Sequence, residues 1–247
     1  MDELDWDALA RAHMVKQISD AATVQAALAR LWETTLDPSD IARSFALFQE
    51  RAVPLIMAGR SISKAEAQRY FEAVHSLSGL SSELADVYEY QWPERAAKAS
   101  LSAASGKALQ RVEALQAKGA PIAATFELAK RAMLASAKRQ MLNAGRERVT
   151  GLTRTSGYGR WARVSDGAPC AFCLMLVSRG PVYTHDSVRF RAHDGCGCGV
   201  RPVRAGESGW TDQARQARAL YDEVGGLGEL RQRLDARKRA ASLGLAA

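Results

Sequence analysis

All four cysteines of the 247-residue chain fall in one short window, and a histidine lies among them. Cys170 and Cys173 form a C-x-x-C pair, and His193, Cys196 and Cys198 form an H-x-x-C-x-C group. Thiolate and imidazole are ligands that Zn²⁺ prefers, and structural zinc sites take four of them from two short loops. The sequence therefore predicts a structural zinc site that uses four of these five residues.

The sequence leaves open which four residues bind the metal. A shell of four cysteines leaves His193 as a neighbouring non-ligand or a reactive residue. A shell that includes His193 leaves Cys196 or Cys198 as a free thiol. Residues without a Cβ let the backbone turn tightly around an ion, and three of them flank these ligands: Gly195, Gly197 and Gly199.

Other chemistries of clustered cysteines fit the sequence less well. A thioredoxin-like redox pair belongs to a strand–helix–strand unit, and two more cysteines with a histidine make a metal the simpler explanation. Two disulfides need an oxidising compartment, whereas the acidic N-terminus shows no secretory signal and indicates a reducing cytosol. A zinc deaminase needs an H-x-E or C-x-E element before its P-C-x-x-C motif. No such element precedes Cys170.

Common catalytic motifs are also missing, so we expect no enzymatic activity. The sequence has no G-x-S-x-G or H-E-x-x-H motif and no complete P-loop. An enzymatic alternative is a zinc-dependent nuclease, although aspartates of this kind are more typical of turns. Its candidate residues are His185, Asp186, His193 and Asp194.

Charge is unevenly distributed along the chain, whose net charge is +7. The first 94 residues have eight Lys and Arg against 15 Asp and Glu, and the basic excess begins at Arg95. An acidic segment is suited to docking on a protein, and a basic one to an anionic partner such as DNA or RNA, although a basic excess is also typical of solvated helices. Four arginines around the second ligand group are candidates for neutralising nucleic-acid phosphates: Arg189, Arg191, Arg201 and Arg204.

The residues that position this site follow a long helical region. An apolar stripe with helical period covers about 7–33, and Asp37 and Pro38 have the types of an N-cap and a first helical residue. Ser63 and Glu66 have capping-box spacing, which predicts the start of another helix.

Two further helical segments follow in the sequence. One extends from Leu84 to about Lys118, with a kink or break at Pro93. The other begins at Pro121, and Gly145 is of the type that ends a helix.

Composition changes after residue 145, where Gly, Ser, Thr and Arg replace the helical pattern. Strand-like segments occupy 160–164, 180–183 and 199–203, and helical character returns at Thr211. No apolar run reaches the roughly 18 residues that span a bilayer, so we expect no membrane partner. The predicted fold is mainly α, with three parts: a helical protein-docking domain over 1–145, a small α+β zinc-knuckle module over 146–205, and a helical tail over 206–247.

The module resembles the MuF-like minor head proteins of tailed bacteriophages, in the form common among phages of actinobacteria. The shared pattern is W-x-R-V, an Asp-Gly turn, C-x-F-C, a Ser-Arg-Gly-Pro-x-Tyr segment and H-x-x-C-x-C before a short strand. The resemblance is close over about 145–205, and the helical first half agrees only in kind. The pattern falls on Trp161, Arg163, Val164, Asp166, Gly167, Cys170, Phe172, Cys173, Ser178, Arg179, Gly180, Pro181, Tyr183, His193, Cys196, Cys198, Pro202 and Val203.

This resemblance implies a minor capsid protein needed for head morphogenesis. Such a protein associates with the portal inside the head, is present in few copies, and assists assembly, DNA packaging or ejection. The implied location is the virion interior near the portal, and the host cytoplasm during assembly. The major capsid or scaffold protein and the genomic DNA are further candidate partners. Some relatives carry a protease or toxin domain, whereas this chain ends in a helical tail, so we expect no protease activity. The alternative is a zinc-knuckle protein that binds nucleic acid.

Overall fold

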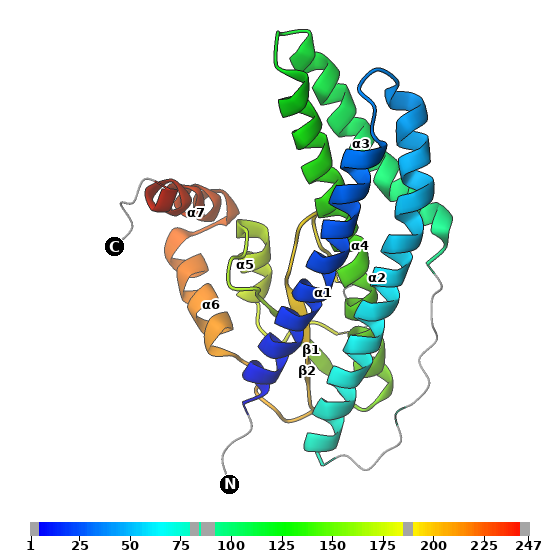
Figure 1. Ribbon diagram of the computed structural model, residues 1–247. Coiled ribbons are helices and arrows are strands. Elements are labelled where there is room, and N and C mark those ends of the chain that lie inside the picture. The colour runs from blue at the N-terminus through cyan, green and yellow to red at the C-terminus, as the bar shows by residue number, and fades with distance from the viewer. Residues whose placement is uncertain (1–4, 80–83, 85–91, 185–189, 243–247) are drawn as a thin grey trace.

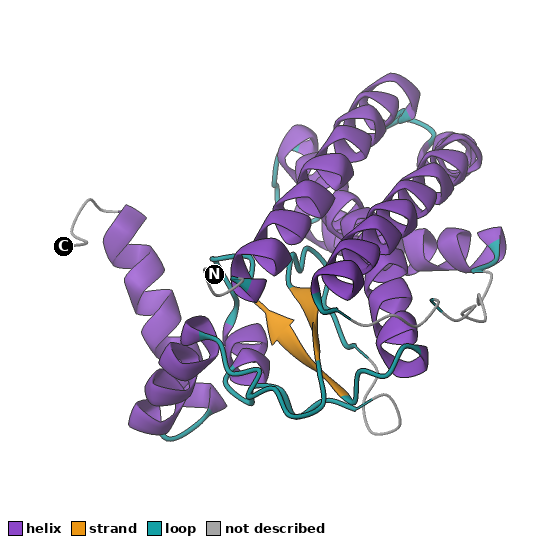
Figure 2. Ribbon diagram, turned by 90° about the horizontal axis from the view of Figure 1, so that it is seen from below, coloured by secondary structure: helices purple, strands orange, loops and turns teal. Residues whose placement is uncertain are grey.

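The computed structural model describes residues 5–79, 84, 92–184 and 190–242, and this part of the chain is mainly helical, as predicted. Seven helices and two short strands make up the described residues. Figures 1 and 2 show a bundle of long helices on one side, shorter helices on the other, and the strands between them. Among the described helices, none is both long and apolar enough to cross a membrane.

The bundle consists of four helices that pack around a shared apolar core. Large apolar side chains from three of these helices are fully buried there, namely Leu28, Phe48, Ile56 and Met133. Removal of such side chains from water is the main source of folding free energy in a bundle of this kind. The four helices are α1 (Trp6–Thr35), α2 (Ile41–Leu77), α3 (Glu94–Gln116) and α4 (Ile122–Thr155).

Two predicted helix starts in this region are wrong. The N-cap of α2 is Asp40, whose side chain accepts from the Arg43 amide, whereas Asp37 forms a local turn by accepting from the amide and hydroxyl of Ser39. Ser63 starts no helix, because α2 continues through it. Its hydroxyl instead donates to Oε1 of the buried Gln17 side chain on α1, so the capping-box spacing reflects a contact between helices.

The predicted helix end at Gly145 is also wrong, since α4 continues to Thr155. The predicted boundary between residues 145 and 146 therefore lies inside a helix. Gly145 is required by packing: a Cβ there would lie 2.7 Å from Ser63 Oγ and 2.8 Å from Gln17 Nε2. The glycine thus allows close contact between α1, α2 and α4.

A small mixed segment follows α4. Strands β1 (Arg160–Val164) and β2 (Gly199–Val203) pair antiparallel at the positions predicted, with Trp161 opposite Pro202. The third predicted strand is reduced to a single bridge between Trp161 and Tyr183.

Three helices complete the fold. The first is the short helix α5 (Ala171–Val177), which directly follows Cys170. The predicted helical tail forms α6 (Asp212–Val224) and α7 (Leu227–Ser242), and both contact α5. Buried Val177 of α5 packs against Ala214 and Ala217 of α6. In Figure 1 these helices lie on the opposite side of the strands from α2 and α4.

Candidate metal centre

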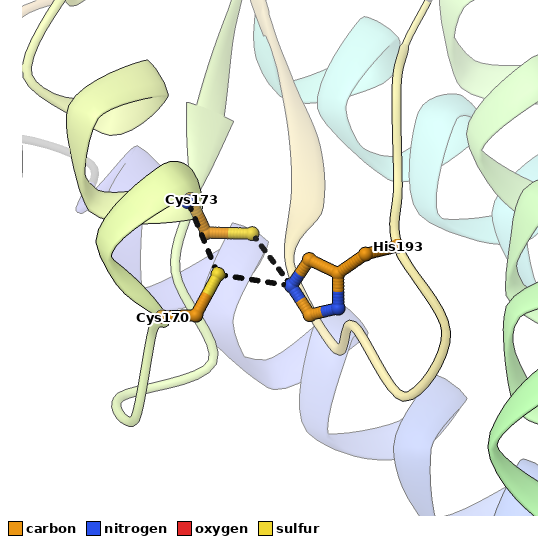
Figure 3. A group of neighbouring side chains, drawn as sticks. All are labelled: Cys170, Cys173 and His193. Carbon is orange, nitrogen blue, oxygen red and sulfur yellow. Dashed lines mark hydrogen bonds between the residues drawn. The ribbon is translucent and has the colours of Figure 1, made fainter. Parts of the chain in front are cut away.

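The first ligand pair lies at the start of α5. Cys170 is the N-cap of this helix, and its Sγ accepts a hydrogen bond from the Cys173 amide at 3.4 Å. Residues three apart in the first turn of a helix lie on one face, so both sulfur atoms point toward the same space. Figure 3 shows them facing His193.

The second ligand group lies on the loop that leads into β2. Gly195 adopts a φ of 79°, a left-handed conformation that favours glycine, and the turn is closed by a bond from the Cys196 amide to the His193 carbonyl. The Gly195 amide also donates to the Ala135 carbonyl on α4 at 3.0 Å, which anchors the loop to the bundle. Cys198 then lies directly before β2.

The five predicted ligands converge from these two loops. His193 Nε2 lies 3.0 Å from Cys170 Sγ and 3.4 Å from Cys173 Sγ, and Cys173 Sγ lies 3.6 Å from Cys196 Sγ. Donor atoms within 4.8 Å of one another form two groups that share Cys173: one with Cys170 and His193, the other with Cys196 and Cys198.

The separation of the Cys173 and Cys196 sulfurs is suited to a metal ion, and the two contacts of His193 Nε2 are somewhat shorter than ligand pairs of zinc. Tetrahedral Zn²⁺ with its usual bond lengths holds neighbouring donors about 3.5–3.8 Å apart. The 3.6 Å between the sulfurs of Cys173 and Cys196 is far longer than the roughly 2.05 Å of a disulfide bond. All four cysteines are free thiols, and three of them are buried. The cysteine and histidine side chains could therefore hold a metal ion.

The ring of His193 is oriented as a ligand. Its Nδ1 lies 2.7 Å from the Asp194 carbonyl oxygen. A carbonyl only accepts, so Nδ1 carries a proton and the lone pair of a neutral ring lies on Nε2, which faces the two sulfurs (Figure 3). Metal-binding histidines typically fix their tautomer through such a bond from the other ring nitrogen.

Two buried arginines also reach the sulfur atoms, and the sequence interpretation gave neither of them this role. Arg146 of α4 donates to the carbonyl oxygens of Cys196 and Cys198 at 2.8 and 2.9 Å, and its Nη2 lies 3.7 Å from Cys196 Sγ. Arg163 of β1 places Nη1 3.7 Å from Cys173 Sγ. Arg163 could have been suspected from its place in the W-x-R-V pattern, whereas no local signal marks Arg146.

The electrostatics of the sulfur cluster are uneven. Hydrogen bonds from the thiols of Cys173 and Cys198 lower the pKa of Cys196, and the charge of Arg146 lowers it further. Burial lowers the pKa of Arg146, an effect that the cysteine sulfurs oppose. The same contacts raise the pKa values of Cys173 and Cys198, so negative charge is more favourable on Cys196 than on these two thiols.

The four arginines predicted to bind nucleic acid have different environments. Arg189 lies outside the described residues, and Arg191 is exposed. Arg201 is buried, and its guanidinium pairs with the carboxylates of Asp7 and Glu207. Arg204 is half-buried and donates to the Ser78 carbonyl, so Arg191 is the most accessible of the described three.

The residues of the nuclease alternative are only partly described. His185 and Asp186 lie outside the described residues. The carboxylate of Asp194 accepts from Arg139 Nε at 2.6 Å, so this side chain is engaged with α4.

Comparisons with known proteins place this fold in a family. The model of the VG15 protein family matches residues 1–224, a range that includes both the bundle and the metal-binding loops. The Gene 15 protein of Mycobacterium phage D29 is 32% identical over a match that covers 33% of this chain and 42% of that protein, less than half of its length. No solved structure gives a significant match. The predicted association with bacteriophages is confirmed by these two matches, and the chain belongs to the VG15 protein family.

Proposed function

We propose that this protein is a MuF-like minor capsid protein of a tailed bacteriophage. In this role it associates with the portal inside the head and assists assembly, DNA packaging or ejection. The observation that carries the proposal is that the residues of the minor-head pattern form one structural unit around the cysteine cluster. The family and phage matches support the association with bacteriophages on which this proposal builds.

The contacts within this unit explain why the pattern has its residue types. The ring of Trp161 stacks on Tyr183 with centroids 4.5 Å apart, and the Trp161 amide donates to the Tyr183 carbonyl. The Tyr183 hydroxyl donates to the Leu176 carbonyl at the end of α5. Arg163, two residues along β1, reaches Cys173. The aromatic residues therefore fix α5, and with it the first ligand pair, against β1.

The proposed cofactor is a structural Zn²⁺ bound by four of the residues Cys170, Cys173, His193, Cys196 and Cys198. The donor set is rich in sulfur, as structural zinc sites are, and the histidine has the tautomer of a ligand. When bound, the ion links the α5 loop to the loop before β2. We assign no catalytic step to this site, so the protein is proposed to be a non-enzymatic component.

The proposed location is the virion, close to the portal, after assembly in the host cytoplasm. The acidic first 94 residues include α1 and α2, which present the surface proposed to dock on the portal. The major capsid or scaffold protein is a second candidate partner. Genomic DNA is a third, through the basic residues that follow Arg95, with Arg191 the accessible candidate among the described arginines.

Co-expression with the portal protein of the same phage tests this function. A tagged full-length chain is expected to co-purify with portal oligomers at a salt concentration that removes nucleic acid. The comparison is a variant in which exposed acidic residues of α1 and α2 are replaced by basic ones. It should lose binding to the portal while the cysteine cluster stays intact. Absence of the protein from purified virions and from portal complexes would contradict the proposal.

The same preparation distinguishes the alternatives. Salt-sensitive binding to naked DNA or RNA without affinity for the portal favours a zinc-knuckle nucleic-acid-binding protein. DNA cleavage that is lost on substitution of His193 by Ala favours the zinc-dependent nuclease.

A further inference from the structure

Arg146 and Arg163 are unusual because they are buried beside sulfur atoms. Their exposed fractions are 5% and 3%. Arg146 contacts the side chain of Asn143 and the carbonyls of Cys196 and Cys198. Within the described part of the chain, neither guanidinium is paired with a carboxylate, and Arg163 Nε is buried without a hydrogen-bond partner.

A buried guanidinium needs a nearby negative charge. Transfer of an unpaired cation from water into a protein interior is strongly unfavourable, and arginine does not escape this by releasing its proton at physiological pH. A carboxylate near the loop, Asp166, is held by the amides of Gly197 and Ala168. Among the described residues, the candidate anions beside the two arginines are the cysteine sulfurs: Cys196 Sγ lies 3.7 Å from Arg146 Nη2, and Cys173 Sγ lies 3.7 Å from Arg163 Nη1.

We infer that Arg146 and Arg163 are the built-in countercharges of an anionic metal–thiolate cluster, and that Arg146 makes helix α4 part of the metal centre. This inference rests on the proposed metal site. A divalent cation with three thiolates and a neutral imidazole carries a net charge of −1, and with four thiolates −2. Four thiolates, one divalent cation and two guanidinium groups sum to zero.

The aromatic ring of Phe190 completes this arrangement. Arg163 lies 3.8 Å and Arg146 4.8 Å from its centroid. A ring face attracts cations, so Phe190 stabilises both guanidinium groups. The ring also packs beside the sulfur cluster, where it shields the charges from water and strengthens their interaction.

Arg146 has a second role as a positioning residue. Its donation to the carbonyls of Cys196 and Cys198 fixes the backbone of the second ligand loop against α4. Arg163 acts in the same way on the other side, since its Nη2 donates to the carbonyl of Arg191, two residues before His193. Each arginine therefore places a positive charge near sulfur and also donates hydrogen bonds to the backbone of the second ligand loop.

The test measures Zn²⁺ affinity of the full chain by competition with a chromophoric chelator. The variants are Arg146→Gln, Arg163→Gln and Arg146→Lys, and the matched control is Arg60→Gln. Arg60 is a similarly buried arginine on α2 that donates to the Gln140 carbonyl and pairs with the Glu147 carboxylate, and among the described residues it has no sulfur partner. We expect each Gln variant near the cluster to weaken zinc binding about 10–100-fold, the usual range for residues that support metal ligands. Arg146→Lys should recover part of the loss, and Arg60→Gln should bind as the original protein does.

Replacement of zinc by Co²⁺ gives a spectroscopic measurement that responds to charge near sulfur. A purely structural role of the arginines would not change it. A positive charge near sulfur stabilises the sulfur electrons, so its loss shifts the thiolate-to-Co²⁺ charge-transfer band to longer wavelength. We expect this shift in Arg146→Gln and Arg163→Gln and not in Arg60→Gln. Unchanged affinity and band position in both Gln variants would overturn the inference, as would equal weakening in Arg146→Lys and Arg146→Gln. If the unaltered protein binds neither ion, the proposed metal site itself fails.

Discussion

The helical bundle and the cysteine-containing segment are stabilised by different interactions. The centre of the bundle is occupied by large apolar side chains such as Phe48, Ile56 and Met133. The centre of the segment between β1 and β2 is occupied by three buried cysteines and two buried arginines. The segment also has buried apolar side chains, including Trp161, Val164 and Val200, but these belong to a cluster that it shares with α1, α2 and α4. The bundle is thus centred on apolar side chains, whereas the segment adds a cluster of thiols and guanidinium groups that could hold a metal ion.

Helix α4 belongs to both regions. Its first half contributes Ala129 and Met133 to the bundle core. From Ala135 onward it contacts the ligand loop three times, through the Ala135 carbonyl, Arg139 and Arg146. The loop is therefore attached to a helix whose own stability comes from the bundle.

The largest predicted effect is that of metal removal, which should change amide exchange in the cysteine-containing segment and not in the bundle. Chelation should abolish amide-exchange protection in β1 and β2, because structural zinc contributes on the order of 10 kcal/mol in zinc-finger peptides. Amides in the middle of α2 should stay protected, since apolar packing holds them. Hydrogen–deuterium exchange with and without chelator measures both.

Substitution of Cys173 by Ser provides the matched control for this experiment. It removes the sulfur that both ligand groups share. Chelator should cause no further change in this variant, and equal loss of protection in α2 would contradict the division into two regions.

The second prediction concerns a substitution that destabilises the bundle and leaves the metal centre intact. Gly145→Ala should destabilise the protein by about 1–3 kcal/mol, because the added methyl group meets Ser63 and Gln17 in a packed interior. Gly106→Ala on α3 is the control, since a Cβ there meets nothing within 4 Å and alanine favours a helix. Chemical denaturation should show opposite signs for the two variants, and equal zinc affinity.

A third prediction uses a buried histidine of the bundle. His13 stacks on Tyr70, and burial lowers its pKa to about 4. The unfolded chain therefore binds a proton at higher pH than the folded one. The stability that neutral His13 provides is complete above about pH 6.5 and is lost as the pH falls toward 4, with about 2 kcal/mol lost at pH 5.

The His13→Gln variant isolates this contribution. The unfolding free energies of both proteins are compared at pH 7.5 and pH 5, so that effects of acid on the metal centre cancel. The original protein should lose more stability than the variant between these two pH values. An equal loss would mean that His13 is protonated in the folded state.

The smallest predicted effect concerns the contact between the regions. Arg139 and Asp194 form an ion pair whose side chains are 25% and 47% exposed. Such a pair contributes about 0.2–1 kcal/mol. A double-mutant cycle with Arg139→Gln and Asp194→Asn should give a coupling energy in this range, and a value several times larger would indicate that this pair governs the attachment of the loop.

Local patterns predicted the parts of the fold that local interactions determine. Strands β1 and β2 and the return to helix at Thr211 occur where expected, because residue type and spacing suffice for them. The predicted helix boundaries at Ser63 and Gly145 are wrong, because both residues make contacts between helices that are distant in sequence. The spacing of the C-x-x-C and H-x-x-C-x-C groups likewise predicted that the five candidate ligands lie close together. It gave no sign of Arg146, which reaches the ligand loop from about 50 residues earlier in the chain.

The most direct test of the central claim is elemental metal analysis of the purified protein, with thiols titrated before and after chelation. The account predicts about one zinc ion per chain and cysteines that react only after the ion is removed. Absence of metal together with four freely reactive thiols would contradict it.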